Sequence, residues 1–208
     1  MKIAVIQAAS CADKNPLLYK YARMYAKDAA VYDFGCFSAK EGYSYIEIAL
    51  LAGLLLASGA IDLVITGCSS GQGMMLACNS MPGVLCGYLP APRDAFLFGR
   101  INNGNAVSLP LGEDYTYAGE ENLRATLEAL FTGEFGAGWP EGSRERKQRD
   151  TRLLKELRTI SQVRFIDLLQ KADGASVRRA LTKSDVVSFV LEHGTDAEIR
   201  AWLEKNIP

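Results

Sequence analysis

Residues 1–131 alternate short β-branched runs with longer segments of helical periodicity, and this alternation constrains the fold more than any other feature. Strands separated by helices pair in parallel, because a parallel connection needs a crossover of about a dozen residues or more. We therefore predict an α/β fold, a Rossmann-like three-layer αβα arrangement around a five-stranded parallel sheet. The predicted strands are residues 2–7, 30–34, 61–66, 84–88 and 105–109, and the predicted helices are residues 15–28, 43–58, 73–80, 92–101 and 117–131.

A glycine-rich segment closes this region. Residues 132–142 contain four glycines and a proline, which disfavour regular structure, so we predict one domain over residues 1–142 and a helical C-terminal extension over residues 143–208. Residues 143–170 are rich in arginine and lysine and are predicted to be helical. The apolar residues that we expect to form the buried stripe of this basic helix are Leu153, Leu154, Leu157, Ile160 and Val163.

The last forty residues are predicted to form two short helices. One runs from about Ser184 to His193 and stops at Gly194. The next starts at Thr195, where Glu198 three residues later completes a capping-box pattern.

Composition excludes several classes of protein. With 208 residues, 49% hydrophobic, and a net charge of −1, the chain is typical of a globular protein with one sizeable core and favours no nucleic-acid partner. Its five cysteines form no Cys-x-x-Cys pair, so we expect neither a disulfide framework nor a zinc site. Free thiols are typical of a reducing compartment, so we expect a cytoplasmic location. The strand-like start at residues 2–6 predicts no signal peptide, and the longest apolar stretch, residues 46–57, is shorter than the roughly 18 residues that a membrane span needs.

A thiol and a glycine-rich turn follow the third predicted strand, in Cys68-Ser69-Ser70-Gly71-Gln72-Gly73. If a helix begins near Gly73, its free N–H groups and positive dipole end favour a thiolate at Cys68 and an anion beside it. Leu76 stands where a dinucleotide fingerprint needs glycine or alanine, and no P-loop lysine is present. The chemistry that this pattern favours is proton transfer or acyl-type attack beside an oxyanion, although an empty turn and a buried structural cysteine fit it equally well.

Four segments carry motifs of a known enzyme family. Residues 68–73, with Asn79 and residues 82–84, are similar to Cys-Gly-Thr-Gly-x-Gly…Ala-Asn-Lys…Gly-Ile. Residues 100–107 resemble Arg-x-His-Asn-Asp-x-Asn-Val with one inserted residue, and residues 42–45 occupy the place of Asp-Tyr-Pro-His/Tyr. Residues 141–144 and the arginines after them are similar to Gly-Gly-Arg-His-x-x-Arg. On these motifs the chain resembles the type B ribose-5-phosphate isomerase and galactose-6-phosphate isomerase family.

The resemblance implies an aldose–ketose isomerisation of a phosphorylated sugar through an enediolate, with no metal and no other cofactor. Cys68 would be the base that moves the proton between two sugar carbons, and Ser70 would assist with its hydroxyl. The N–H groups around Ser69, Gly71 and Gly73 would hold the developing enediolate oxygen.

The same resemblance assigns a second group of residues to the substrate. Asn103 would donate to the enediolate oxygen, and Tyr43 would line the pocket. Arg144 and Arg149 would hold the phosphate by charge-assisted hydrogen bonds. In the family these arginines often reach a neighbouring subunit, which implies a homodimer, or a dimer of dimers, with the site near a subunit interface.

The departures from the family pattern bear on ring opening. Asn102 takes the place of the histidine that opens the sugar ring, and asparagine cannot take up a proton at neutral pH. We therefore expect open-chain substrates to be preferred. Gly42 lacks the family's carboxylate, for which Glu41 is the nearest substitute, and the only histidine, His193, is predicted to be a surface residue at a helix end.

Two other functions remain open at this point. A non-catalytic sugar-phosphate-binding or regulatory protein could keep the same fold and lose the chemistry, and a structural oligomer would bind no ligand. The isomerase differs from both because its Cys68 exchanges a substrate proton.

Overall fold

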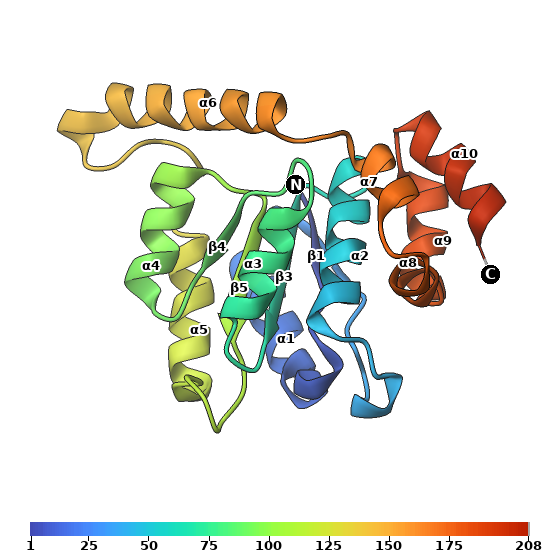
Figure 1. The fold of residues 1–208 in the computed structure, drawn as a ribbon. Coiled ribbons are helices and arrows are strands. Elements are labelled where there is room, and N and C mark those ends of the chain that lie inside the picture. Colours follow the sequence, from blue (N-terminus) through green and yellow to red (C-terminus); the bar gives the residue numbers. More distant parts are fainter. Residues whose placement is uncertain (208) are drawn as a thin grey trace.

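The computed structural model describes residues 1–207 and shows a parallel sheet between two helical layers (Figure 1). The strands stand in the order β2-β1-β3-β5-β4, and every neighbouring pair is parallel. The strands are β1 (Lys2–Val5), β2 (Ala30–Asp33), β3 (Leu63–Cys68), β4 (Cys86–Tyr88) and β5 (Ala106–Pro110). The predicted α/β fold and its five parallel strands are confirmed.

Each face of the sheet carries its own helices and its own half of the core. The face that holds Ala4 and Val64 is covered by α2 (Tyr45–Ala57) and α3 (Gln72–Ser80). The opposite face is covered by α1 (Asn15–Tyr25), α4 (Pro92–Leu97) and α5 (Gly119–Leu130). Because side chains alternate along a strand, Cys68 shares the face of Val64, on the α2 and α3 side.

Helix α2 is apolar on all sides because it lies in the middle of the molecule. Ser44 caps its first turn, and the Glu47 carboxylate accepts a hydrogen bond from the Ser44 N–H, which completes a capping box. The sheet covers one side of the helix, and helices of the C-terminal extension cover the other (Figure 1). This double burial explains why the longest apolar run of the sequence belongs to a globular core.

The C-terminal extension forms five helices, four of which pack into the same core as α2. Val186, Val190 and Leu203 of the extension are fully buried there. The predicted basic helix over residues 143–170 is in fact two helices. The five are α6 (Arg144–Ser161), α7 (Phe165–Lys171), α8 (Gly174–Leu181), α9 (Ser184–His193) and α10 (Ala197–Asn206). None of the helices within residues 1–207 is long and apolar enough to cross a membrane.

Two expectations for the tail are wrong. Helix α8, capped by the Asp173 carboxylate, was not predicted. The N-cap of α10 is Asp196, which accepts from the Ile199 N–H, because Thr195 instead donates to the carbonyl of Ser58. The Glu198 carboxylate is taken by Arg164, at 2.8 Å, so no capping box forms with Thr195.

The predicted buried stripe of the basic helix is also wrong for a single chain. Helix α6 crosses the amino-terminal edge of the sheet and projects beyond it (Figure 1). It is attached through a few polar contacts, among them Thr151 Oγ1 to the Ile101 carbonyl at 2.7 Å. Leu157 and Ile160 are 63% and 75% exposed. Helical spacing shows that one face is apolar, but it does not show what covers that face.

Candidate active site

The Cys68 loop lies at the carboxyl end of β3 and leads directly into α3. Gly71, the residue before the helix, has a φ of 74°. A Cβ at this position would lie 2.8 Å from the Tyr88 ring and 2.9 Å from the Leu109 carbonyl oxygen, so only glycine fits. The Gly71 N–H bonds the Cys68 carbonyl at 3.2 Å, so this residue shapes the loop and leaves donation to a substrate to its neighbours.

Three other amide groups of the loop are available to a ligand. Among the hydrogen bonds of residues 1–207, the N–H groups of Ser69, Ser70 and Gly73 have no acceptor. The Ser70 hydroxyl accepts from the Gln72 N–H at 3.3 Å, which leaves its own proton free to donate. The loop therefore offers a set of donors around the Cys68 thiol, at the beginning of a helix.

A cavity of about 540 Å³ opens over this loop. Cys68, 8% exposed, lines it together with Ser69, Ser70, Gly73 and Tyr43. Sequence reasoning gave no role to three other lining residues, Ser10, Tyr45 and Tyr115, although Tyr45 belongs to the motif at residues 42–45. Among residues 1–207, no charged side chain lines the cavity, so this part of one chain supplies hydroxyl and amide donors but no cation for an acidic group.

A second thiol lies behind the first. Cys11 Sγ is 3.7 Å from the Ser10 Oγ and 3.9 Å from the Ser69 Oγ, and the residue is only 2% exposed. Burial raises the pKa of the Cys11 thiol, and the neighbouring Cys68 raises it further. Burial therefore makes the Cys11 thiolate harder to form, and Cys68, which lines the cavity, is the candidate base.

The remaining predicted residues lie at the opposite edge of the sheet. Asn102 is exposed at the end of a π-helical turn that follows α4, and Asn103 comes next, with a φ of 48°. Arg144 and Arg149 are on α6, where they form ion pairs of 3.3 Å with Glu141 and 3.0 Å with Asp150.

The strand β5 separates the two groups within one chain. Cys68 pairs with Pro110 at the end of β5, whereas Asn103 precedes the first residue, Ala106. The stretch from Ala106 to Pro110 alone spans about 13 Å at roughly 3.3 Å per residue. The structure thus brings Cys68, Ser69, Ser70, Gly73 and Tyr43 together, and holds Asn102, Asn103, Arg144 and Arg149 apart from them.

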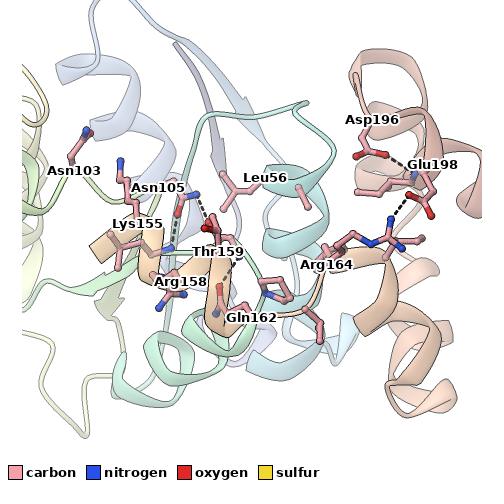
Figure 2. A pocket seen from close by; sticks show the side chains of 18 residues that line it. Leu56, Asn103, Asn105, Lys155, Arg158, Thr159, Gln162, Arg164, Asp196 and Glu198 are labelled. Atoms are coloured by element: carbon pink, nitrogen blue, oxygen red, sulfur yellow. Dashed lines mark hydrogen bonds and ion pairs between the residues drawn. The ribbon is translucent and has the colours of Figure 1, made fainter. Parts of the chain in front are cut away.

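A second cavity, of about 570 Å³, lies on this amino-terminal side (Figure 2). Asn103 and Lys155 lie at one end of it, and the Arg164–Glu198 ion pair lies at the other. Burial lowers the pKa of Lys155, a member of the basic segment to which sequence reasoning gave no role. The cavity adjoins the exposed apolar face of α6, so this side of the molecule presents cations and apolar surface together.

Two further expectations can be judged from the geometry. Glu41 does not replace the carboxylate missing at Gly42, because its side chain accepts from the Phe37 and Ser38 N–H groups and faces Lys183. His193 lies at the end of α9, as predicted, and its ring is tilted by 56° against the ring of Phe189, with 4.4 Å between the ring centres. Within residues 1–207, no three His, Cys, Asp or Glu side chains are grouped closely enough to hold a metal ion.

This combination of a parallel α/β sheet and a thiol in a donor-rich loop matches a known class of enzyme. The model of the ribose/galactose isomerase family covers residues 2–149. The chain therefore belongs to the ribose/galactose isomerase family and is a sugar isomerase. No curated protein matches the chain.

Two solved structures correspond to the chain over nearly its whole length. One is a 4-deoxy-L-threo-5-hexosulose-uronate ketol-isomerase complexed with a tartrate, 36% identical, with a TM-score of 0.91 over 99% of this chain and 98% of that one. The other is a ribose-5-phosphate isomerase from Vibrio parahaemolyticus, 33% identical, also with a TM-score of 0.91 over 99% and 98% of the two chains. The type B ribose 5-phosphate isomerase of Trypanosoma cruzi, 20% identical with a TM-score of 0.63, shares the fold over 77% of this chain and 99% of its own.

Proposed function

We propose that the protein interconverts the aldose and ketose forms of a phosphorylated sugar, with Cys68 moving the proton. The Cys68 thiolate takes the proton from the carbon beside the carbonyl, and negative charge develops on the carbonyl oxygen. The free N–H groups of Ser69, Ser70 and Gly73 stabilise that charge, and the Ser70 hydroxyl adds a further donor. Cys68 then delivers its proton to the former carbonyl carbon, while the hydroxyl proton of the neighbouring carbon moves to the former carbonyl oxygen. That neighbouring carbon becomes the new carbonyl, and the sequence requires no metal ion. The observation that carries this proposal is the ring of unpaired donors around a thiol in a cavity.

The divided site supports a homodimer, or a dimer of dimers. We propose that Asn102, Asn103, Arg144 and Arg149 of one subunit complete the Cys68 cavity of another, because one chain alone places no cation there. The exposed apolar face of α6, with Ile160 75% exposed, is the part of this edge that a partner would cover. Such an arrangement supplies the phosphate-binding arginines without any change in the fold of the monomer.

A uronate is the second candidate for the substrate. The whole-length match that is 36% identical is a uronate ketol-isomerase bound to tartrate, and the Cys68 cavity holds no cation that would demand a phosphate dianion. The test is turnover of ribose 5-phosphate and of 4-deoxy-L-threo-5-hexosulose uronate in D₂O, with deuterium incorporation followed by mass spectrometry. Deuterated product from the phosphate supports our proposal, and deuterated product from the uronate alone assigns the second candidate. The reaction is followed over many turnovers to equilibrium, because Cys68 can carry a proton across without exchange in a single turnover, and no exchange even then contradicts proton transfer by Cys68.

The shared site can be tested by mixing two defective variants. We expect Cys68→Ala and the double variant Arg144→Ala/Arg149→Ala to be nearly inactive separately at low substrate concentration. After denaturation and refolding together, they should recover about a quarter of wild-type activity, because half of randomly formed dimers are mixed and each contains one intact site. The matched control is Cys68→Ala refolded with itself. No recovery in the mixture, with dimers verified by light scattering, would contradict a site built from two subunits.

Asn102 leads to a prediction about ring opening. Asn102→His should raise activity on cyclic aldose phosphates by at least about tenfold, because a histidine can accept and donate the protons that ring opening requires. Activity on an acyclic sugar phosphate should stay unchanged, and Asn102→Gln, which cannot be protonated, should behave like wild type. If the unaltered protein isomerises ribose 5-phosphate as efficiently as an acyclic analogue, another group opens the ring.

The proposed setting is the cytoplasm, with no nucleic-acid partner. All five cysteines are free and buried, and free thiols are typical of a reducing compartment. The basic charge of α6 is partly neutralised by its own acidic residues, as in the Arg146–Asp150 pair at 3.4 Å, which is typical of a solvated helix.

A further inference from the structure

The C-terminal extension contacts the candidate active site through the turn between α8 and α9. Thr182 in this turn places its Oγ1 2.9 Å from the hydroxyl oxygen of Tyr43, which lines the Cys68 cavity. The guanidinium of Arg179, at the end of α8, lies 4.3 Å from the centre of the Tyr43 ring. Thr182 lies 139 positions after Tyr43 in the sequence, so this contact joins distant parts of the chain.

The direction of the Tyr43–Thr182 hydrogen bond follows from the other bonds of Thr182. Its hydroxyl proton is donated to the Arg179 carbonyl at 2.7 Å, and Arg179 donates back to the same oxygen at 3.2 Å. A hydroxyl has one proton, so Thr182 must accept from Tyr43. The phenol proton of Tyr43 therefore points to the extension, and the ring is held between this bond and the Arg179 cation.

The same turn holds the segment that precedes Tyr43. Arg179 donates to the Glu41 carbonyl, and the buried Lys183 lies 3.6 Å from the Glu41 carboxylate. On its other side, the Tyr43 carbonyl accepts from the Ala9 N–H at 2.9 Å, beside the loop after β1. This wall of the cavity is thus fixed from two directions, and one of them is the extension.

The extension distinguishes this chain from shorter relatives of the same fold. The family model ends at residue 149, and the T. cruzi isomerase corresponds to only 77% of this chain although 99% of its own length is matched. The two structures that match over 99% of this chain include the extension. The Tyr43 contacts therefore come from a part of the chain that the family model does not describe.

We propose that Thr182 and Arg179 are positioning residues of the active site, which act by holding Tyr43 as the wall of the Cys68 cavity. The proposal rests on the proposed function, in which Tyr43 lines the substrate pocket. It makes the extension a determinant of substrate fit, in addition to a cover for α2.

The test uses Thr182→Val, which keeps the shape of the side chain and removes the acceptor. The first measurement is the rate at which iodoacetamide alkylates Cys68, followed by mass spectrometry of its peptide. We expect an increase of about tenfold, because a released ring opens the cavity over a thiol that is otherwise 8% exposed. The second is kcat/KM with whichever sugar the wild-type enzyme turns over, expected to fall by about tenfold, with most of the change in KM.

Four further variants separate positioning from general destabilisation. Thr182→Ser should restore both readouts, since it restores the hydroxyl. Thr132→Val removes a similar hydroxyl, bonded to the Glu128 carbonyl at the end of α5 and remote from the cavity, and should leave both unchanged. Tyr43→Phe removes the same bond from the other side, so Tyr43→Phe/Thr182→Val should alkylate no faster than Tyr43→Phe alone.

The outcomes distinguish this inference from the proposed function. Wild-type alkylation in Thr182→Val, or equal acceleration in Thr132→Val, overturns the positioning role. If the wild-type enzyme turns over neither sugar, the proposed function fails, and the alkylation series still decides whether the extension holds Tyr43. Additive effects in Tyr43→Phe/Thr182→Val would also overturn the positioning role, because they would show that the two hydroxyls act separately.

Discussion

Replacing Cys68 with alanine is expected to abolish proton exchange between substrate and solvent. A general base contributes about 10²–10⁴ to the rate, and in the described part of the chain the tyrosines are the only other ionisable side chains that line the cavity. The change removes one sulfur atom beside a loop, so the free energy of unfolding should fall by only about 1 kcal/mol. The measurement is deuterium incorporation into substrate at equilibrium, with urea unfolding as the check on folding.

Cys11→Ala is the matched control for this prediction. Cys11 lies next to the same loop, but it does not line the cavity, and burial raises its pKa. The variant should therefore retain proton exchange while losing a comparable amount of stability. Wild-type exchange in Cys68→Ala, or loss of exchange in Cys11→Ala, would contradict Cys68 as the base and point to Cys11 instead.

The largest effect on stability is expected from Gly71→Ala. A φ of 74° costs an L-residue about 1–2 kcal/mol. The added Cβ would also lie 2.9 Å from the Leu109 carbonyl oxygen, an overlap that we expect to add about 1–3 kcal/mol. Urea unfolding should therefore show a loss of about 2–5 kcal/mol, and the displaced loop should lose activity as well.

Two glycine variants separate the backbone cost from the steric overlap at Gly71. Gly83 has a φ of 77° and free space around its Cβ position, so Gly83→Ala should show the backbone cost alone. Gly73 has no positive φ, and its Cβ would meet Tyr45 at an ordinary 3.6 Å, so Gly73→Ala should be nearly neutral for folding. A Gly71→Ala variant no less stable than Gly83→Ala would show that the loop can move away from Leu109.

Local patterns in the sequence accounted for most of the fold. The alternation of strand and helix periods predicted the five parallel strands, and the segment after residue 66 predicted a thiol at the carboxyl edge of the sheet. Both depend on neighbours within a few residues, for which spacing and conformational preference are sufficient. The cap of α10 was placed one residue too early because Thr195 and Asp196 can both cap a helix, and only the contact with Ser58 selects between them.

The sequence by itself determined the class of fold, the position of Cys68 at the end of a strand, and the motifs of the family. Tertiary structure decided how the site residues are distributed. In a parallel sheet all strands end at one edge and begin at the other, so Cys68, at the end of β3, and Asn103, before β5, are separated although their motifs read as one set. It also decided that α6 leaves its apolar face exposed and that Thr182 bonds Tyr43. These contacts join distant segments through packing, and no local spacing encodes them.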